Sequence, residues 1–302
     1  MKSFGVISEI PSIRLYDYAA TCGAFNIDLP TKYVIPEDRR PMVRDQGNVG
    51  ACVAFSLAEI LEVFNYIETS RKEQFSAGFI YGRHRDKDSK TVGMRVINAL
   101  DHLTKIGSTK TSVFDELYEQ PEAYEIIQSK ASELDKYAEP YRIKGYASLI
   151  NADKSLQDKK IKTALFTTNY PVVAVSNKYF GEKHCIILIG WDDEKDSYVF
   201  QNSWGKDYGD GGISSIPKNK INECYLLSDE VFELNFNDVS KNDWFYDGVK
   251  QVVLDGIMNG TSDTTFEPNR PITRAEFAVA IDRLCKRIDE RFAYINERLN
   301  EL

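Results

Sequence analysis

A cysteine, a histidine and an asparagine in this chain have the chemistry needed to hydrolyse an amide bond. Cys52 is the candidate nucleophile, because it stands where a loop rich in Gly and charge ends and a helical apolar pattern begins. A thiol attacks a carbonyl only as the thiolate, and the N-terminus of a helix stabilises that form. Six residues upstream, the side-chain NH2 of Gln46 could bind the developing oxyanion together with the backbone N–H of Cys52.

The base must come from one of three histidines. His84 lies in a charged, turn-like stretch and His102 in the polar part of a predicted helix, so we expect a solvated structural role for both. His184 opens an apolar strand pattern, and by itself it is more typical of a satisfied core histidine. Asn202 changes that assessment, because its side-chain oxygen can fix the imidazole while Trp204 shields the bond from water.

The elements that position these residues follow from the apolar pattern. Helices are predicted from apolar residues at helical spacing, at residues 51–69, 92–105 and 121–136. Strands are predicted from short β-branched or aromatic runs bounded by Gly, Asp and Asn, at residues 171–176, 185–189 and 197–201. Helices first and strands after predict an α+β domain of two segregated layers.

Composition limits the possible functions. The 302 residues have room for a catalytic domain of about 200 residues and one small module. A net charge of −8 argues against a nucleic-acid partner. No apolar run reaches the roughly 18 residues of a membrane span, and residues 1–20 lack the apolar core of a secretory signal, although a signal removed before residue 1 remains an alternative. The odd, scattered cysteines, with no C-x-x-C pair, predict neither a disulfide framework nor a metal site.

Three ordered motifs resemble the papain family of cysteine peptidases. Residues 46–55, QGNVGACVAF, resemble its oxyanion and nucleophile segment, Q-G-x-C-G-S-C-W-A-F. Residues 184–190, HCIILIG, are similar to its histidine strand, and residues 202–212, NSWGKDYGDGG, to N-S-W-G-x-x-W-G-x-x-G. The likeness covers residues 28–230 and implies a papain-like domain of a helical half and a β half, over residues 29–232.

The resemblance also implies a reaction. Cys52 would form an acyl-thioester with a protein or peptide substrate, with His184 as base, Asn202 as its orienter and Gln46 as oxyanion donor. No cofactor or metal is needed. Two alternatives stay open: a cell-wall amidase or transpeptidase that also uses Cys and His, and a non-catalytic surface-binding protein on a peptidase fold.

The departures from the family pattern bear on regulation and specificity. Val49 stands where many members have a disulfide cysteine, so the domain does not need an oxidising compartment. Val53 replaces the usual aromatic after the nucleophile, and Lys183 and Cys185 border the second specificity pocket that the resemblance implies. Residues 1–28 are too few for the family's helical prosegment; they form either a short plug across the cleft or an edge strand or loose arm.

Residues 236–281 resemble one S-layer homology repeat, with an Asp-Val opening, G-I-x-x-G, F-x-P and T-R-A-E-F. Thr273 and Glu276 predict a capping box at the start of the last helix. The resemblance implies a small helical module at residues 235–284 that binds anionic cell-wall polysaccharide through Arg274. The alternative is a spacer, because the family usually works in groups of three. The module suggests the cell surface or exterior, while the missing signal leaves a cytoplasmic location or another release route open.

The C-terminus carries a heptad pattern. Apolar residues step by four and three along one predicted helix face, at Ile281, Cys285, Ile288, Phe292, Ile295, Leu299 and Leu302. This seam predicts an oligomerising coiled-coil helix at residues 281–302, most simply in a homotrimer, because repeated β-branched core residues disfavour dimers. The alternative is an amphipathic helix that packs back on its own domain.

Overall fold

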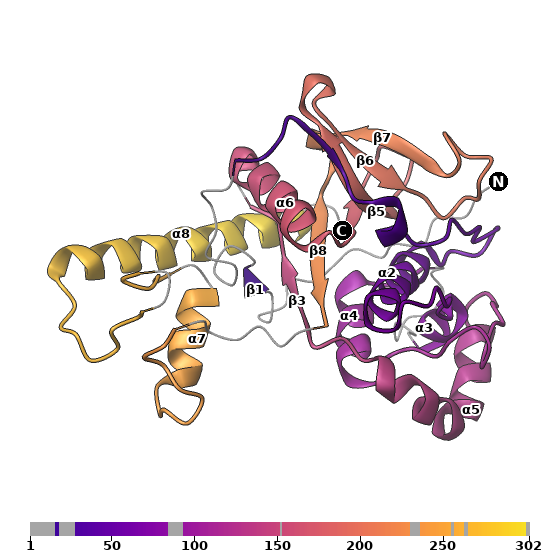
Figure 1. The fold of residues 1–302 in the computed structure, drawn as a ribbon, viewed down its shortest axis with the longest axis horizontal. Helices are drawn as coiled ribbons and strands as arrows, with labels where there is room; N and C mark the ends of the chain where they lie inside the picture. The colour runs from indigo at the N-terminus through magenta and orange to yellow at the C-terminus, as the bar shows by residue number, and fades with distance from the viewer. Residues whose placement is uncertain are drawn as a thin grey trace.

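The computed structural model describes residues 16–17, 28–83, 93–151, 153–229, 236–254, 257–262 and 265–299, and Figure 1 shows its ribbon. Residues 28–229 contain a group of helices and an antiparallel sheet. Residues 236–299 contain two further helices. Residues 28–229 therefore have the α+β architecture that the sequence predicts.

The helical half is built from α2 (Cys52–Thr69), α3 (Ala77–Arg83), α4 (Val96–Lys105) and α5 (Glu122–Ala138). Helix α2 is buried from Cys52 through Asn65, because α3, α4 and the sheet all contact it. It ends at Ser70, which has the left-handed φ of 58° typical of a C-cap. The predicted helices are confirmed with shifted ends: α4 begins four residues later than predicted, after Gly93 with its φ of 126°.

The sheet has the strand order β1-β3-β8-β4-β5-β6-β7, and β2 pairs with β5. Its strands are β1 (Tyr16–Asp17), β2 (Lys32–Val34), β3 (Gly145–Ser148), β4 (Val172–Ser176), β5 (His184–Asp192), β6 (Ser197–Gln201), β7 (Ile213–Pro217) and β8 (Glu223–Ser228). Short 3-10 helices lie at Glu37–Arg39, Glu139–Tyr141, Asp193–Lys195 and Lys218–Lys220. All strand pairs except β1 with β3 are antiparallel.

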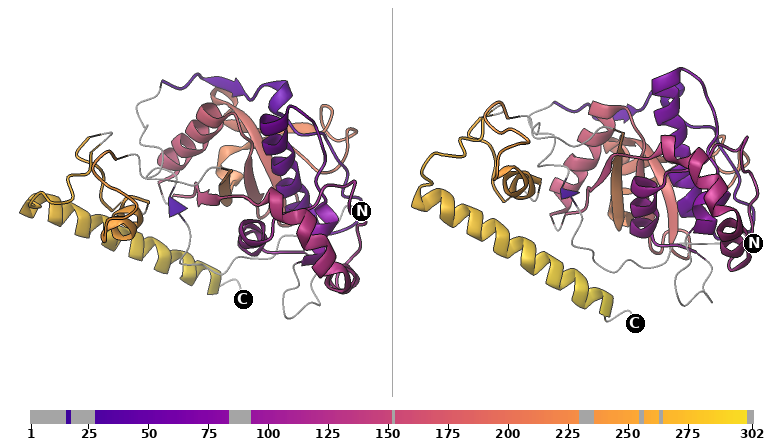
Figure 2. Two further views of the ribbon diagram at one scale, coloured as in Figure 1. Left: turned by 60° about the horizontal axis from the view of Figure 1, so that its bottom comes forward. Right: turned by 90° about the horizontal axis from the view of Figure 1, so that it is seen from below.

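Strand β5 is the centre of the sheet. All nine of its residues are buried, because α2 contacts it and so does α6 (Lys154–Thr168), on the opposite face of the sheet (Figure 2). A strand covered on both faces carries apolar residues at successive positions instead of alternating ones. This explains the continuous apolar run that begins at His184.

Three features of the catalytic part differ from the sequence expectations or extend them. The solvated role expected for His102 is wrong: its side chain is buried on α4, with its ring 5.8 Å from that of Phe79. Helix α6 was not predicted. Tyr16 and Asp17 pair with the edge of β3, as in the edge-strand alternative for the N-terminal arm. Residues 1–15 and 18–27, with Cys22, and residues 84–92, with His84, lie outside the described residues.

The C-terminal module contains α7 (Tyr246–Leu254) and α8 (Arg274–Leu299). Its small core includes Val239, Val249 and Val253. The carboxylate of Asp238 accepts hydrogen bonds from the backbone N–H groups of Phe266 and Glu267, at 2.9 and 2.7 Å. These bonds join the Asp-Val opening of the repeat to its F-x-P segment.

The start of α8 has the predicted capping box. The Thr273 hydroxyl accepts from the Glu276 N–H at 3.2 Å, and the Glu276 carboxylate accepts from the Thr273 N–H at 2.8 Å. Along the same helix, Ile281 and Ile288 are 41% and 43% exposed, and Cys285 is also exposed. The seam residues from Phe292 onward lie outside the described side chains, so the coiled coil stays a prediction.

Candidate active site

Cys52 is the first residue of α2 and is completely buried. The helix packs against strand β5. The Cys185 thiol of β5, next to His184, is hydrogen-bonded to the side chain of Ser56, which lies one turn after Cys52 on α2. Burial raises the pKa of the Cys185 thiol, so this second cysteine is held neutral. The helix N-terminus at Cys52 favours a thiolate there.

His184 is the first residue of β5 and is fully buried. Its Nε2 lies 2.7 Å from the Oδ1 of Asn202. The same oxygen accepts the backbone N–H of Ser203 at 2.8 Å, so it is an acceptor and the Nε2 of His184 carries the proton. Burial lowers the pKa of His184 to about 4, against the opposing effect of the Asn202 hydrogen bond. The resting imidazole is therefore neutral, with Nδ1 as the basic nitrogen.

Two aromatic rings cover the histidine. Trp204 stacks on the His184 ring with centroids 4.5 Å apart and an interplanar angle of 29°. Phe180 packs edge-on against His184 at 4.9 Å and against Trp204 at 5.5 Å. Both rings shield the His184–Asn202 bond from water, which strengthens it and fixes the orientation of the imidazole.

Gln46 is tied to the segment that follows Asn202. Its backbone N–H donates to the Ser203 carbonyl at 2.9 Å, and its Oε1 accepts from the Ser203 hydroxyl at 2.6 Å. Its Nε2 donates to the Val49 carbonyl at 2.9 Å, which uses one of the two amide hydrogens. The side chain is 1% exposed, so its orientation is set by these bonds.

Backbone contacts thus link the segment that contains Gln46 to the segment that begins with Asn202. Asp45 pairs with Trp204, and the Gly205 N–H donates to the Arg44 carbonyl at 2.9 Å. Gln46, His184 and Asn202 belong to this linked set, and Cys52 lies at the start of the helix that packs on β5. Arg274 is elsewhere, as the first residue of α8.

Sequence reasoning missed two supports of this site, Ser203 and Phe180. Ser203 lies inside the N-S-W-G motif, so the motif itself contained the signal. Phe180 lies in the loop before β5, where no periodicity marks a buried ring. Four of the described cysteines form no disulfide: Cys52, Cys185, Cys224 and Cys285.

Within the described residues, no group of three or more His, Cys, Asp or Glu side chains is arranged to hold a metal ion. Among the helices of the same described residues, none is both long and apolar enough to cross a membrane.

The fold is that of papain-like cysteine proteases. The model of the papain family cysteine protease matches residues 37–234, and the chain belongs to this family. The model of the S-layer homology domain matches residues 235–278.

Similar proteins agree with both assignments. Cathepsin K of Mus musculus is 21% identical over 212 residues, which is 62% of this chain and 59% of cathepsin K. The surface-layer 125 kDa protein of Lysinibacillus sphaericus is 44% identical over 46 residues, 15% of this chain and 4% of that protein. The chain spans 54% to 66% of the length of the first three curated cysteine proteinases that it matches.

Solved structures show the same fold. Xylellain, a cysteine protease from Xylella fastidiosa, superposes with a TM-score of 0.59 at 19% identity, covering 75% of this chain and 96% of xylellain. A Carica candamarcensis cysteine protease in complex with E-64 gives a TM-score of 0.52 at 17% identity, covering 66% and 99% of the two chains.

Proposed function

We propose that this chain is a cysteine endopeptidase that hydrolyses peptide bonds through an acyl-thioester on Cys52. The observation that carries the proposal is the buried His184–Asn202 hydrogen bond of 2.7 Å, held beside the helix that begins at Cys52. Membership of the papain family supports the same reaction class.

The geometry supports a two-step reaction. His184 Nδ1 takes the thiol proton, and the Cys52 thiolate attacks the scissile carbonyl while the Gln46 amide and the Cys52 N–H bind the oxyanion. The imidazolium then gives its proton to the leaving amine, and the acyl-thioester forms. In the second step the neutral imidazole takes a proton from water, the resulting hydroxide attacks the thioester, and the C–S bond breaks to release the free carboxylic acid. The Cys52 thiolate that leaves takes the proton back from the imidazolium, which restores the thiol and the neutral imidazole.

Labelling with a thiol-directed peptidyl epoxide, followed by mass spectrometry, tests this proposal. We expect modification at Cys52, where the helix N-terminus favours the thiolate, and none at Cys185, which serves as an internal control because burial keeps its thiol neutral. Pre-incubation with casein peptides should slow the labelling. Modification elsewhere, or cleavage of peptidoglycan without cleavage of casein, would contradict the proposal and favour a cell-wall amidase.

We propose that the C-terminal module binds anionic cell-wall polysaccharide through Arg274 and places the enzyme at the cell surface. Arg274 is exposed at the N-terminus of α8, where the helix dipole also favours an anion. The likeness to a surface-layer protein supports this role. Arg274→Ala should weaken sedimentation with purified cell walls, whereas Arg283→Ala, on the same helix, should not. Equal effects of the two substitutions would leave the module as a spacer.

We further propose that α8 joins three copies of the chain. Apolar side chains on the described part of α8 are exposed, at Phe277, Val279, Ile281, Leu284 and Ile288. Three weak modules on one body would bind a polymer by avidity. Light scattering should give a trimer for the intact chain and a monomer for a version ending at residue 286. Monomers in both cases at micromolar concentration would exclude the coiled coil.

A further inference from the structure

Two glutamates lie inside the helix that begins with Cys52. Glu59 and Glu62 are three residues apart on one face of α2, and they are 1% and 2% exposed. A buried carboxylate is costly unless it is paired or protonated. One oxygen of each carboxyl, Glu59 Oε1 and Glu62 Oε2, is buried without a hydrogen-bond partner.

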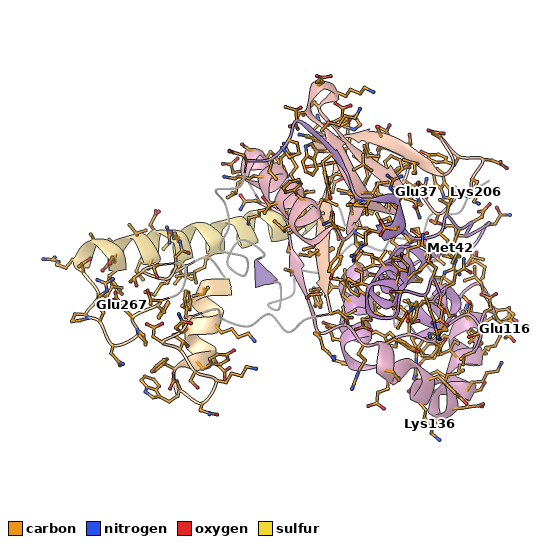
Figure 3. All side chains as sticks on the ribbon, viewed as in Figure 1. Glu37, Met42, Glu116, Lys136, Lys206 and Glu267 are labelled. Atoms are coloured by element: carbon orange, nitrogen blue, oxygen red, sulfur yellow. The ribbon has the colours of Figure 1, made fainter. Side chains whose placement is uncertain are left out.

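The other oxygen of each carboxyl holds a different segment of the active site. Glu62 Oε1 accepts the backbone N–H of Met42 at 2.8 Å, and Met42 lies beside α2 (Figure 3). Glu59 Oε2 accepts from the Nε2 of Gln201 at 3.4 Å. Met42 is four residues before Gln46, and Gln201 is the residue before Asn202. The pair therefore joins the nucleophile helix to both segments that carry its predicted partners.

The groups that face this pair are two cations from the chain on either side of α2 and two neutral side chains from the sheet. Arg44, in the loop before α2, acts on both glutamates, and Lys72, after α2, acts on Glu62. From the sheet, Cys185 of β5 and Gln201 of β6 face Glu59.

Burial raises the pKa of Glu59 to about 8, with Arg44 opposing and Glu62 adding to the shift. Burial likewise raises the pKa of Glu62 to about 7, against the Met42 N–H and Arg44. If both ionise, two buried carboxylates face the half-buried Arg44 guanidinium.

We propose that Glu59 and Glu62 are positioning residues: while at least one of the two carboxyls is protonated, they hold the Gln46 loop and the Gln201–Asn202 segment in register on the nucleophile helix, and ionisation of both loosens the register. This inference rests on the proposed function, because the site that it positions is the proposed peptidase site. The physical cause is the second negative charge that appears in the interior when both glutamates are ionised. The cost of burying that charge is relieved only when water enters between α2 and β6.

The pH dependence of the free energy of unfolding tests whether Glu59 is protonated in the folded protein. A group whose pKa is raised on folding contributes stability that is present below its unfolded pKa and is lost as pH rises through its folded pKa. The measurement is urea unfolding of the full-length Cys52→Ala protein, with and without Glu59→Gln. Between pH 7 and 8, the unfolding constant of the protein that keeps Glu59 should rise by up to about tenfold more than that of the protein with Glu59→Gln. The pKa of His184, at about 4, keeps that residue out of this window. Equal slopes for the two proteins would overturn the proposal.

Site geometry tests the positioning. In the active chain at pH 6.5, Glu59→Leu should lower kcat at least tenfold with KM within twofold, and slow alkylation of Cys52 by iodoacetamide to a similar degree. Glu59→Gln keeps an acceptor oxygen and should restore both rates. Adding Gln201→Leu to Glu59→Leu should cost little more, because both substitutions remove one interaction.

Two outcomes separate this proposal from the peptidase assignment. If Glu59→Leu matches Glu59→Gln in both rates, the residue only fills space and the positioning role is wrong. If alkylation of Cys52 responds as expected but the unmodified chain cleaves no peptide, the proposed function fails while the positioning role stands.

Discussion

The catalytic part (residues 28–229) and the C-terminal module (residues 236–299) place the polar groups that we propose as functional, and those that support them, in opposite environments. In the catalytic part, Gln46, His184 and Asn202 are at most 1% exposed and are bonded to their neighbours. In the module, Glu276 and Arg274 are exposed at the start of α8. Bond making needs groups fixed away from water, whereas a polymer must be able to reach its ligands. Substitutions should therefore have large effects in the first region and small ones in the second.

The two regions also shift pKa values by different causes. The pKa of His184 is lowered by burial, which makes its charged form costly. The pKa of Glu276 is lowered to about 2, first by its hydrogen bond to Arg270 and then by the Thr273 N–H, on an exposed side chain. The first shift is a property of the interior and resists salt, while the second is screened by solvent ions.

The largest expected effect is at the nucleophile. Cys52→Ala should abolish peptide cleavage, because no other group can form the acyl-thioester, and His184→Ala should lower kcat by at least about 10³-fold. Cys52→Ala should keep the wild-type unfolding curve at pH 8, which serves as the control for folding, whereas His184→Ala also loses the buried hydrogen bond to Asn202 and is compared at a urea concentration where it is fully folded. Turnover by purified Cys52→Ala protein would contradict the assignment.

The next largest effect is the pH dependence that His184 imposes on stability. Its pKa is lowered on folding from 6.5 to about 4, so its contribution is present above pH 6.5 and is lost as pH falls toward 4. The upper bound is about 3 kcal/mol. Compared with His184→Ala in urea unfolding between pH 4 and 6.5, wild type should lose more stability. Parallel curves would mean that the histidine is not buried in its neutral form.

Asn202→Ala should have a smaller effect on catalysis, because Asn202 orients the base and makes no bond to substrate. Loss of orientation is expected to lower kcat by about 10²-fold with little change in KM. Steady-state kinetics on a peptide substrate provide the measurement. Ser203→Ala, which removes only the hydroxyl bonded to Gln46, is a matched comparison and should cost less. If Asn202→Ala lowered kcat as much as Cys52→Ala does, Asn202 would have to act on the reacting atoms themselves and not only on the base.

The four site residues could be predicted from the sequence because the chemistry proposed for them depends on residue types and order, which are visible as motifs. Sequence reasoning missed Glu59 and Glu62, because a glutamate in a helix is ordinarily a solvated position, and only the sheet and the loop that cover α2 bury them. His102 was misjudged for the same reason, since Phe79 covers it. Helix α6 was missed because it buries polar side chains such as Gln157 and Lys160, which hide the apolar period.

The smallest expected effect tests whether the module is energetically separate from the catalytic part. Thr273→Ala removes the hydroxyl that accepts the Glu276 N–H at 3.2 Å, and a lost N-cap costs about 1 kcal/mol. Amide hydrogen exchange in the first turn of α8 should therefore become about fivefold faster. Thr273→Ser keeps the cap and should exchange like wild type.

In the same Thr273→Ala protein, exchange in α2 and β5 and the kinetics of peptide cleavage should stay unchanged. The catalytic part has its own core, which does not include Thr273, so a weakened cap has no route to His184 or Cys52. Wall binding should fall modestly, because Arg274 follows the cap directly and depends on the helix start for its position. Slower peptide cleavage after loss of the cap would show that the two regions are energetically coupled. They would then differ only in how exposed their polar side chains are.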